Sequence, residues 1–398
     1  MFRDIDRKKI RRRWWLRNIF WMILLTATGL TAYYLFVPFI HQVQTMEAEK
    51  QAVQQEGNSF EMVGKEAHEH FVENRLDWFK PGVMANQFKK VSDISQVPLQ
   101  GGWFNTTPLD FNSLRETDHF ILLYFWSTSS VASLNTNRYI EWLWKNYKDS
   151  GLVVVGIHSP QFKSEKNKAA IWQAVQAEGL TFPILLDGEK KLWDKLRVYD
   201  APTQYLLNPA GNVIYSYIGE NNFQEETDIL RQHLTAQGWL VNAPKQVPNF
   251  SDYTGNYTTA DLYTGFNKKR RVFGNDTQGS RNKITSFSLP EQIEQNKIYL
   301  NGDWLVKPEY IESKSNAAVI INFLGSQAYA YMKATEAQPL NTVVTLDGGV
   351  VPAQQQKQIL VTDRGGLYRL TDNTLQYGAH ELIINVPKGV ELYVVRFR

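Results

Sequence analysis

The sequence predicts two folded domains of different class: an α/β domain over residues 96–238 and an all-β sandwich of jelly-roll type over residues 251–398. One transmembrane helix and a helical stalk precede them. Three observations carry this prediction. Buried strands alternate with helical segments in the first domain. Short alternating segments separated by glycine turns fill the second. An uncharged apolar run of about 20 residues follows a basic arm near the N-terminus.

The N-terminal region has the pattern of a membrane anchor. Residues 1–17 hold eight basic and two acidic residues, and the apolar run assigned to residues 18–40 follows directly. Because positive charge stays on the cytoplasmic side, we expect the N-terminus in the cytoplasm and the bulk of the chain outside, held by a single pass. The family resemblance described below implies that the membrane is a bacterial inner membrane and that the outer side is the periplasm. The alternative is a cleaved signal peptide. Its apolar region would be about 7–15 residues and end in a small-x-small site, whereas this run is longer and ends in bulky aromatic residues.

Residues 41–95 are predicted to form a helical stalk and a linker. Apolar residues recur there at loosely helical spacing among Glu, Gln and Lys. His68 and His70 are two residues apart, so on a helix their imidazoles point to different faces. We therefore predict no metal site in this segment.

The first folded domain, residues 96–238, alternates between strands and helices. A mixed α/β sheet that ends in an antiparallel hairpin is the expected result. Strands are expected at His119–Trp126, Gly151–Ile157, Phe182–Leu186, Tyr205–Leu207 and Val213–Ile218, and helices over residues 131–147, 164–178, 189–197 and 223–234.

The second folded domain follows a predicted linker over residues 239–250, which carries two prolines and no periodicity. Turns are expected at Asn301–Gly302 and at three further glycine-containing sites. The expected strand segments of the sandwich are Lys297–Leu300, Ala317–Phe323, Ala328–Tyr331, Thr342–Leu346, Gln358–Val361, Leu382–Val386 and Glu391–Phe397.

Composition excludes several classes of function. The chain has no cysteine, so it has no disulfide, no thiolate nucleophile and no thiolate metal site. The net charge is +3, and the basic excess lies in the N-terminal arm rather than on a folded domain, which argues against nucleic-acid binding. No metal-ligand or phosphate-loop signature is present, so we expect no metal and no cofactor.

Residues 121–135 resemble the thioredoxin-like family of membrane-tethered thiol–disulfide proteins, in its TlpA and redoxin branch. In that branch a buried strand ends in Phe-Trp, and Cys-x-x-Cys follows at the start of a helix. Here Phe125 and Trp126 are kept, and the two cysteine positions fall on Ser130 and Ser133. Residues 201–203, Ala-Pro-Thr, fall where the family has its cis-proline loop.

The C-terminal part resembles a domain that accompanies the thioredoxin-like domain in some members of this family. Its motifs lie at residues 261–266, 301–304, 346–348, 366–368 and 380–382. They are similar to motifs of the β-sandwich that follows the thioredoxin-like domain in the DipZ class of periplasmic proteins. That sandwich is similar in shape to carbohydrate-binding modules. The resemblance therefore implies a DipZ-like arrangement of the two domains.

The serine pair changes the chemistry that the resemblance implies. Thiol–disulfide exchange needs a thiolate that attacks a disulfide sulfur, and a serine hydroxyl cannot replace it. Serine catalysis would need an adjacent base with an orienting partner, and His158 alone does not make a triad. We therefore predict a degenerate redox site at Ser130 and Ser133 with no catalytic residue. Ser129 or Ser130 is expected to cap the following helix.

Binding is the function that this fold retains without cysteines. The family resemblance places a peptide-binding edge at Trp126, Ala201, Pro202 and Thr203, where an extended peptide would add as a strand. The alternative is that these residues only maintain the fold. The sequence thus favours a membrane-anchored, catalytically inactive thioredoxin-like protein that binds a protein partner or acts as a periplasmic scaffold, and not an enzyme.

Two other functions stay open. The sandwich offers glycan or peptidoglycan binding, if its aromatic residues form a sugar-stacking platform rather than core. The other alternative is membership of the thiol–disulfide oxidoreductases by fold only. The candidate platform residues are Trp304, Tyr329, Tyr331, Tyr368 and Tyr393.

Overall fold

The computed structural model divides the chain into two compact units, Met1–Val83 and Met84–Arg398. The predicted basic arm, transmembrane helix and stalk, residues 1–95, lie outside the described residues. Among the described residues, no helix is long and apolar enough to cross a membrane. The structure describes residues 102–110, 114, 118–220, 222–239, 242–250, 257–267, 273–348 and 356–398.

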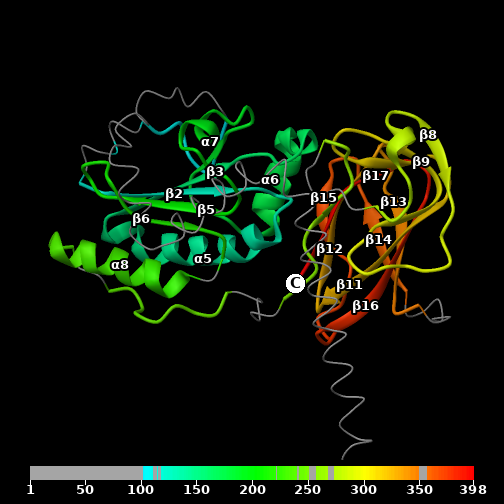
Figure 1. The fold of residues 1–398 in the computed structure, drawn as a ribbon. Helices are drawn as coiled ribbons and strands as arrows, with labels where there is room; N and C mark the ends of the chain where they lie inside the picture. Colours follow the sequence, from blue (N-terminus) through cyan, green and yellow to red (C-terminus); the bar gives the residue numbers. More distant parts are fainter. Residues whose placement is uncertain are drawn as a thin grey trace, which may run out of the picture. The chain divides into compact units, whose positions relative to one another are not determined.

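The first folded domain is built on a mixed sheet with the strand order β1-β4-β3-β2-β5-β6. Strands β2, β3 and β4 are parallel, and the other neighbours pair antiparallel. The predicted strands are confirmed, and β5 with β6 forms the expected hairpin (Figure 1). The bounds are β1 Trp103–Phe104, β2 Phe120–Trp126, β3 Leu152–His158, β4 Ile184–Leu186, β5 Thr203–Leu207 and β6 Val213–Ile218.

Helices cover both faces of this sheet. Helices α5 (Val131–Tyr147), α6 (Lys168–Ala177) and α8 (Phe223–Ala236) contribute to one apolar core, and α7 (Lys191–Lys195) to the other. Figure 1 shows α5 and α8 on one side of the sheet and α7 on the opposite side. Because successive side chains of a strand point to opposite faces, β2 is buried on both, which explains its unbroken apolar run.

The helix predicted over residues 164–178 is divided in two. A 3₁₀ turn, η3 (Lys163–Lys166), comes first, and α6 begins only at Lys168. Asn167 separates them because its side-chain oxygen accepts hydrogen bonds from the backbone N–H groups of Ala169 and Ala170. An asparagine at this position caps a new helix rather than continuing an old one.

The segment after α8 packs against the first domain. Tyr147 donates its hydroxyl to the Pro244 carbonyl, and Arg231 donates to the Ala243 carbonyl at 2.7 Å. Val247 and Phe250 pack against the core that α5 and α8 share. Described residues 242–250 of the predicted linker therefore follow the helical face of this domain.

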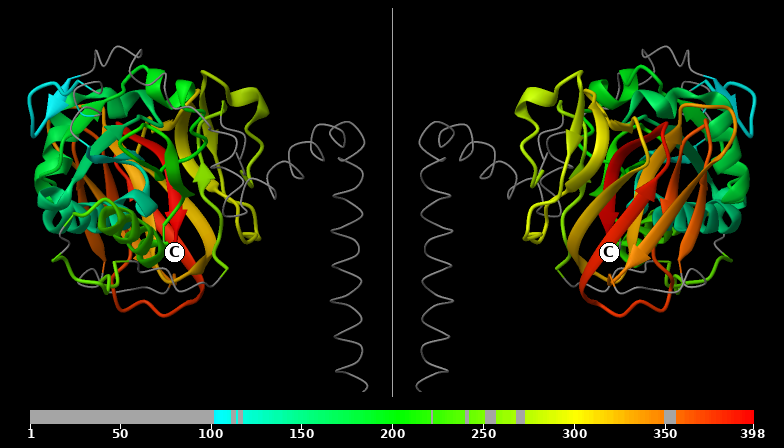
Figure 2. Two further views of the ribbon diagram at one scale, coloured as in Figure 1. Left: turned by 90° about the vertical axis from the view of Figure 1, so that its left-hand side faces the viewer. Right: turned by 90° about the vertical axis from the view of Figure 1, so that its right-hand side faces the viewer.

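The C-terminal domain is an all-β sandwich made from one continuous antiparallel sheet. Its main path is β14-β13-β16-β11-β9-β10-β17-β12-β15, with β7 beside β17 and β8 beside β9. Figure 2 shows the yellow-to-red strands curving around a common core. The bounds are β7 Leu262–Tyr263, β8 Ile284–Phe287, β9 Tyr299–Val306, β10 Ile311–Ser313, β11 Ala317–Gly325, β12 Ala328–Ala334, β13 Leu340–Leu346, β14 Lys357–Val361, β15 Gly366–Arg369, β16 Gly378–Val386 and β17 Val390–Phe397.

The predicted turn at Asn301–Gly302 is wrong, because both residues lie inside β9. Residues 299–301 of this strand pair with β11, whereas residues 304–306 pair with β10. Gly302 lies at the change of partner with φ of 92°, and a Cβ there would come within 3.0 Å of the Ala317 Cβ. The Asn-Gly pair therefore marks a bend at which one strand joins two parts of the sheet.

Candidate functional site

The two serines at the redox positions begin helix α5. Ser130 is its N-cap, and the Ser130 hydroxyl oxygen accepts a hydrogen bond from the Ser133 backbone N–H at 3.2 Å. The predicted helix cap is therefore confirmed at Ser130. The same hydroxyl donates to the Ala201 carbonyl at 3.0 Å. Ala201 precedes Pro202 through a cis peptide bond, so the structure brings the serine pair and the cis-proline loop together.

Neither serine presents its hydroxyl to solvent. Ser130 is 4% exposed and Ser133 is fully buried. The Ser133 hydroxyl accepts a hydrogen bond from the Ser127 backbone N–H at 3.4 Å, and the Ser133 carbonyl accepts from the Tyr124 hydroxyl. Both side chains therefore take part in hydrogen bonds within the fold.

A buried carboxylate holds the loop before Ser130. Glu165, in η3, is 1% exposed. Its Oε2 accepts from the Ser127 hydroxyl at 2.5 Å, the Thr128 hydroxyl at 3.0 Å and the Ser129 backbone N–H at 3.2 Å. We call residues 127–129 the serine loop.

The second oxygen of Glu165 joins that loop to a turn after β3. Its Oε1 accepts from the Ser129 hydroxyl at 2.9 Å and from the backbone N–H groups of Gln161 and Phe162, both at 3.0 Å. A buried carboxylate is costly unless donors surround it, and six donors do so here. None of the six belongs to Ser130, so Glu165 acts as a structural acceptor and not as a base for that hydroxyl.

His158, the histidine considered as a base for the serine pair, packs as an aromatic ring. It ends β3, and its ring meets the Trp126 indole edge-on with a centroid distance of 5.0 Å. Burial lowers the pKa of His158 to about 4, so the imidazole is neutral at neutral pH. The His158 Nε2 has no hydrogen-bond partner among the described residues. This geometry does not support a serine nucleophile activated by His158.

The residues predicted as a peptide-binding edge are buried. Trp126 and Thr203 are fully buried, and Ala201 is 6% exposed. The Ala201 N–H donates to its neighbour Asp200 at 2.8 Å, and its carbonyl accepts from Ser130. A peptide that added as a strand at Ala201 would therefore have to displace existing hydrogen bonds. Tyr199 stays on the surface beside them, with 53% of its side chain exposed.

Comparison with known families agrees with this geometry. Residues 95–216 match the AhpC/TSA family, and residues 259–397 match a family described as the thioredoxin like C-terminal domain. Residues 95–216 form a thioredoxin-like domain of the redoxin type. The resemblance inferred from the Phe-Trp strand end and the cis-proline loop is thus confirmed, and no cysteine is present at either redox position.

Individual relatives cover different parts of the chain. It is 27% identical over 240 residues to the protein DipZ of Mycobacterium bovis, which corresponds to 59% of this chain and 34% of DipZ. The chain therefore spans about a third of the length of DipZ. It is 28% identical over 127 residues to the thioredoxin-like protein SkfH of Bacillus subtilis, covering 32% of this chain and 86% of SkfH. The crystal structure of StoA from Bacillus subtilis aligns with a TM-score of 0.26 at 21% identity, over 28% of this chain and 83% of that one.

Glu165 and its partners Gln161 and Phe162 are not predicted as site residues by the sequence. The apolar spacing places Glu165 near the start of a single helix over residues 164–178. The signal that was available is Asn167, a cap residue that separates Glu165 from α6. Nothing in the local pattern indicated that this carboxylate is buried.

The alternative of a sugar-stacking platform on the sandwich does not fit the structure, because four of its five aromatic residues are buried. Trp304 is fully buried, Tyr331 is 2% exposed and Tyr393 is 3% exposed. Tyr329 is also buried, and Tyr368 is half-buried. No cluster of three or more His, Asp or Glu residues that could hold a metal ion occurs in the part of the chain that the structure describes.

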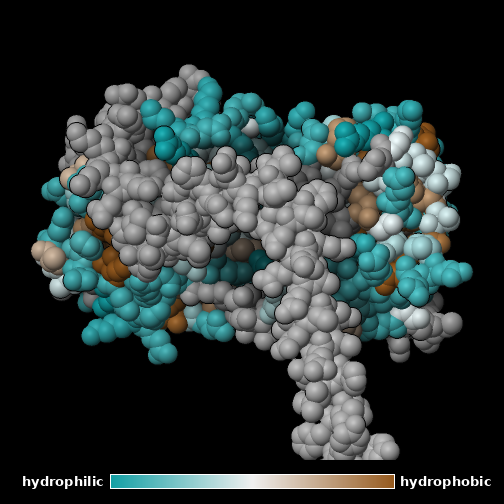
Figure 3. Space-filling model, viewed as in Figure 1, coloured by the Kyte–Doolittle hydropathy of each residue, from teal (hydrophilic) through white to brown (hydrophobic). Residues whose placement is uncertain are grey.

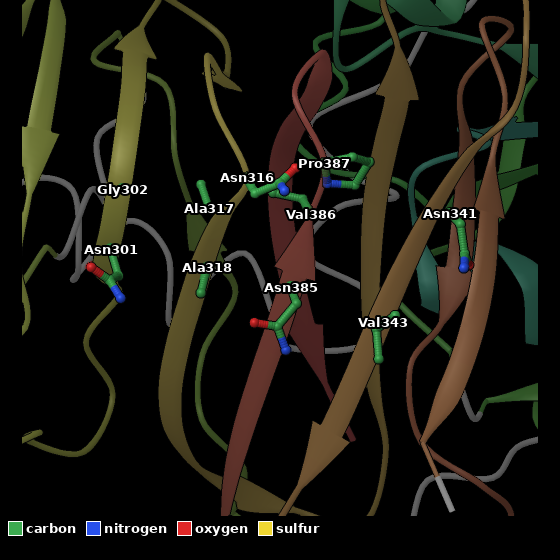
Figure 4. A pocket seen from close by; sticks show the side chains of 10 residues that line it. All are labelled: Asn301, Gly302, Asn316, Ala317, Ala318, Asn341, Val343, Asn385, Val386 and Pro387. Atoms are coloured by element: carbon green, nitrogen blue, oxygen red, sulfur yellow. The ribbon is translucent and has the colours of Figure 1, made fainter. Parts of the chain in front are cut away.

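The sandwich instead has a hollow of about 490 Å³ on strands β9, β11, β13 and β16 (Figure 4). Strand register places Asn301 beside Ala318, Ala318 beside Asn385 and Asn385 beside Val343. Small side chains thus form the floor between exposed amides. We call this feature the asparagine groove, which is lined by Asn301, Gly302, Asn316, Ala317, Ala318, Asn341, Val343, Asn385, Val386 and Pro387.

Replacement of Glu165 by Ala should lower the free energy of unfolding by about 2–4 kcal/mol, because it leaves buried donors without an acceptor. Urea unfolding followed by tryptophan fluorescence measures this change. The matched control is Glu189→Ala, since the Glu189 side chain is 74% exposed and forms an ion pair with the surface residue Lys166. That control should change stability by less than about 0.5 kcal/mol. An equally small effect at Glu165 would show that its hydrogen bonds contribute no net stability.

Proposed function

We propose that this chain is a redox-inactive thioredoxin-like protein that binds protein partners in the bacterial periplasm, held at the inner membrane by its N-terminal segment. The proposal rests on the hydrogen bonding of the two serines at the redox positions. Ser130 and Ser133 keep the place of the reactive cysteines, and both are built into buried hydrogen bonds.

The chemistry of this site supports inactivity in thiol exchange. Exchange proceeds by attack of a thiolate on a disulfide sulfur, and the chain supplies no sulfur nucleophile. The Ser130 hydroxyl donates to the Ala201 carbonyl, so it has no base to take its proton. The site therefore contributes to the structure of the domain and not to a reaction.

The surface beside the serine pair supports a binding role. The cis-proline loop and the end of β2 are present although the chain has no thiol, and both are buried. Thr128 is partly exposed beside them, and Tyr199 and Asp200 are exposed. Hydrophilic residues prevail among the described residues on the face shown in Figure 3, and apolar groups there form only small patches. A small polar surface of this kind suits weak, reversible partners.

The location in this proposal rests on the N-terminal sequence. The arm of eight basic and two acidic residues precedes an apolar run long enough to span a bilayer. The positive-inside rule then puts both folded domains in the periplasm.

The double variant S130C/S133C should gain a reversible disulfide, whereas the parent chain should show no disulfide reductase activity. Positions three residues apart at a helix start are close enough for Cys-x-x-Cys pairing, and the helix N-terminus stabilises a thiolate. Thiol titration against a glutathione redox series measures this gain, with the single variant S133C as control. Reductase activity in the parent chain would refute the proposed inactivity.

A photo-crosslinking amino acid at position 199 of the full-length chain should form discrete adducts with periplasmic proteins in cells. Tyr199 is the appropriate position because it is exposed beside the cis-proline loop. The control position is Leu360 on β14, which is 62% exposed. Adducts at position 199 that are absent at position 360 are expected. The same adducts at both positions, or none at position 199, would contradict a partner surface beside the loop.

A second proposed function concerns the sandwich, and the asparagine groove favours it. Its four amides offer both donors and acceptors and no charge, which suits the hydroxyl groups of a neutral glycan. Figure 4 shows side chains of Asn301 and Asn385 flanking the small Ala318. Glycan binding is therefore proposed at this groove and not at the buried aromatic residues.

Neutral hexasaccharides of glucose and of N-acetylglucosamine are the probes for the groove. Binding by the full chain should weaken about tenfold in the double variant N341A/N385A, since each lost hydrogen bond contributes about 0.5–1.5 kcal/mol. Calorimetric titration measures the affinity, and Asn212→Ala in the β5–β6 turn is the control. Unchanged affinity in the double variant, or no binding by the parent chain, would exclude the groove as a site for these sugars.

A further inference from the structure

Phe162 of the thioredoxin-like domain fills an aromatic cage formed by residues of the C-terminal domain. It is 2% exposed. Its ring stacks on Tyr331 at 5.6 Å with an interplanar angle of 15°, and it lies 5.1 Å from the Tyr393 ring. Tyr263 completes the cage at 6.3 Å. A phenylalanine in this setting is an anchor residue, because an aromatic side chain buried in a pocket carries a large share of contact energy.

Polar contacts surround this anchor on the same turn. The buried guanidinium of Arg396 donates to the Gln161 side-chain oxygen at 2.7 Å and pairs with Asp261. The Lys163 backbone N–H donates to Glu309 at 3.0 Å. Each of the three residues of the turn, 161–163, therefore contacts a partner in the C-terminal domain.

Two further contacts lie outside this turn. Arg398 forms an ion pair with Glu220, in the loop between β6 and α8, at 3.2 Å. Glu220 also accepts a hydrogen bond from Asn135 in α5, five residues after Ser130. Arg364 donates to Gln173 of α6 at 3.0 Å. The C-terminal domain thus contacts three separate elements of the thioredoxin-like domain.

The turn that carries Phe162 is the same turn that positions Glu165. The backbone N–H groups of Gln161 and Phe162 donate to one Glu165 oxygen, and the serine loop donates to both oxygens. A displacement of Phe162 from the cage would therefore remove two of the donors that fix the carboxylate. The contacts form one continuous chain from β12 and β17 to residues 127–129.

We propose that the C-terminal domain is the resident partner of the thioredoxin-like domain, docked beside the degenerate redox site, and that through Phe162 and Glu165 it keeps the serine loop closed over Ser130. This inference does not depend on an external partner. It states that the side of the thioredoxin-like domain next to the serine loop is occupied within the chain. An external protein would then bind at the exposed rim around Tyr199.

A single reporter thiol tests this coupling, because the natural chain has no cysteine. In the full-length variant S130C the thiol is expected to react slowly with a maleimide, since Ser130 is 4% exposed. Addition of Phe162→Ala should accelerate labelling at least about tenfold, because the cage contact no longer fixes Glu165. Gln161→Ala, which removes the acceptor for Arg396 and a long hydrogen bond of 3.5 Å from the Ser129 hydroxyl but leaves the aromatic cage intact, should give a smaller acceleration.

Two controls separate coupling from general loss of stability. Leu382→Ala truncates the core of the C-terminal domain outside the cage, and Trp172→Ala removes a partly exposed aromatic residue on α6. Neither should change labelling of S130C as much as Phe162→Ala. Unchanged labelling in a folded Phe162→Ala chain, or equal acceleration by Leu382→Ala, would overturn the proposal. If Phe162→Ala does not fold, as judged by circular dichroism, unchanged labelling with Gln161→Ala overturns it.

Discussion

The carboxylate of Glu165 is the constraint on which the rest of this site depends. It lies in a short turn after β3, and it accepts six hydrogen bonds from two separate segments of the chain. A group of this kind is stabilising only while all of its donors stay in place, because an unpaired buried charge is expensive. The serine loop, the helix cap at Ser130 and the turn at Phe162 are therefore fixed together.

The fold was largely predictable because it depends on local apolar patterns. Strands β2 and β3 are buried on both faces and read as unbroken apolar runs, and α5 begins where the serine cap indicates. The positions of Ser130 and Ser133 followed from counting after Phe125 and Trp126. The antiparallel sandwich followed from short strands between glycine turns. Each of these features is encoded within about ten residues, which is the range that periodicity can report.

The remaining features depend on contacts between residues far apart in the sequence. Glu165 meets the serine loop across 36 to 38 positions, and Arg396 meets Gln161 across 235. No local pattern distinguishes a buried glutamate from one on a solvated helix face. Local sequence also does not distinguish an exposed tyrosine from a buried one. Tyr331 and Tyr393 could therefore be considered for a sugar platform, although in the structure they enclose Phe162. The pair Asn301–Gly302 was predicted to be a turn, because Asn-Gly occurs both in turns and at bends inside a strand such as the one in β9.

The hydrogen bonds of the Ser130 hydroxyl make the helix start depend on a single oxygen. That oxygen caps α5 and also connects it to the carbonyl before the cis-proline. A thiol is a weak donor and a weak acceptor, so cysteine at position 130 alone weakens both bonds. Introduction of a Cys-x-x-Cys pair at positions 130 and 133 therefore begins with a loss of stability at the start of α5, which only a disulfide between the two positions could offset.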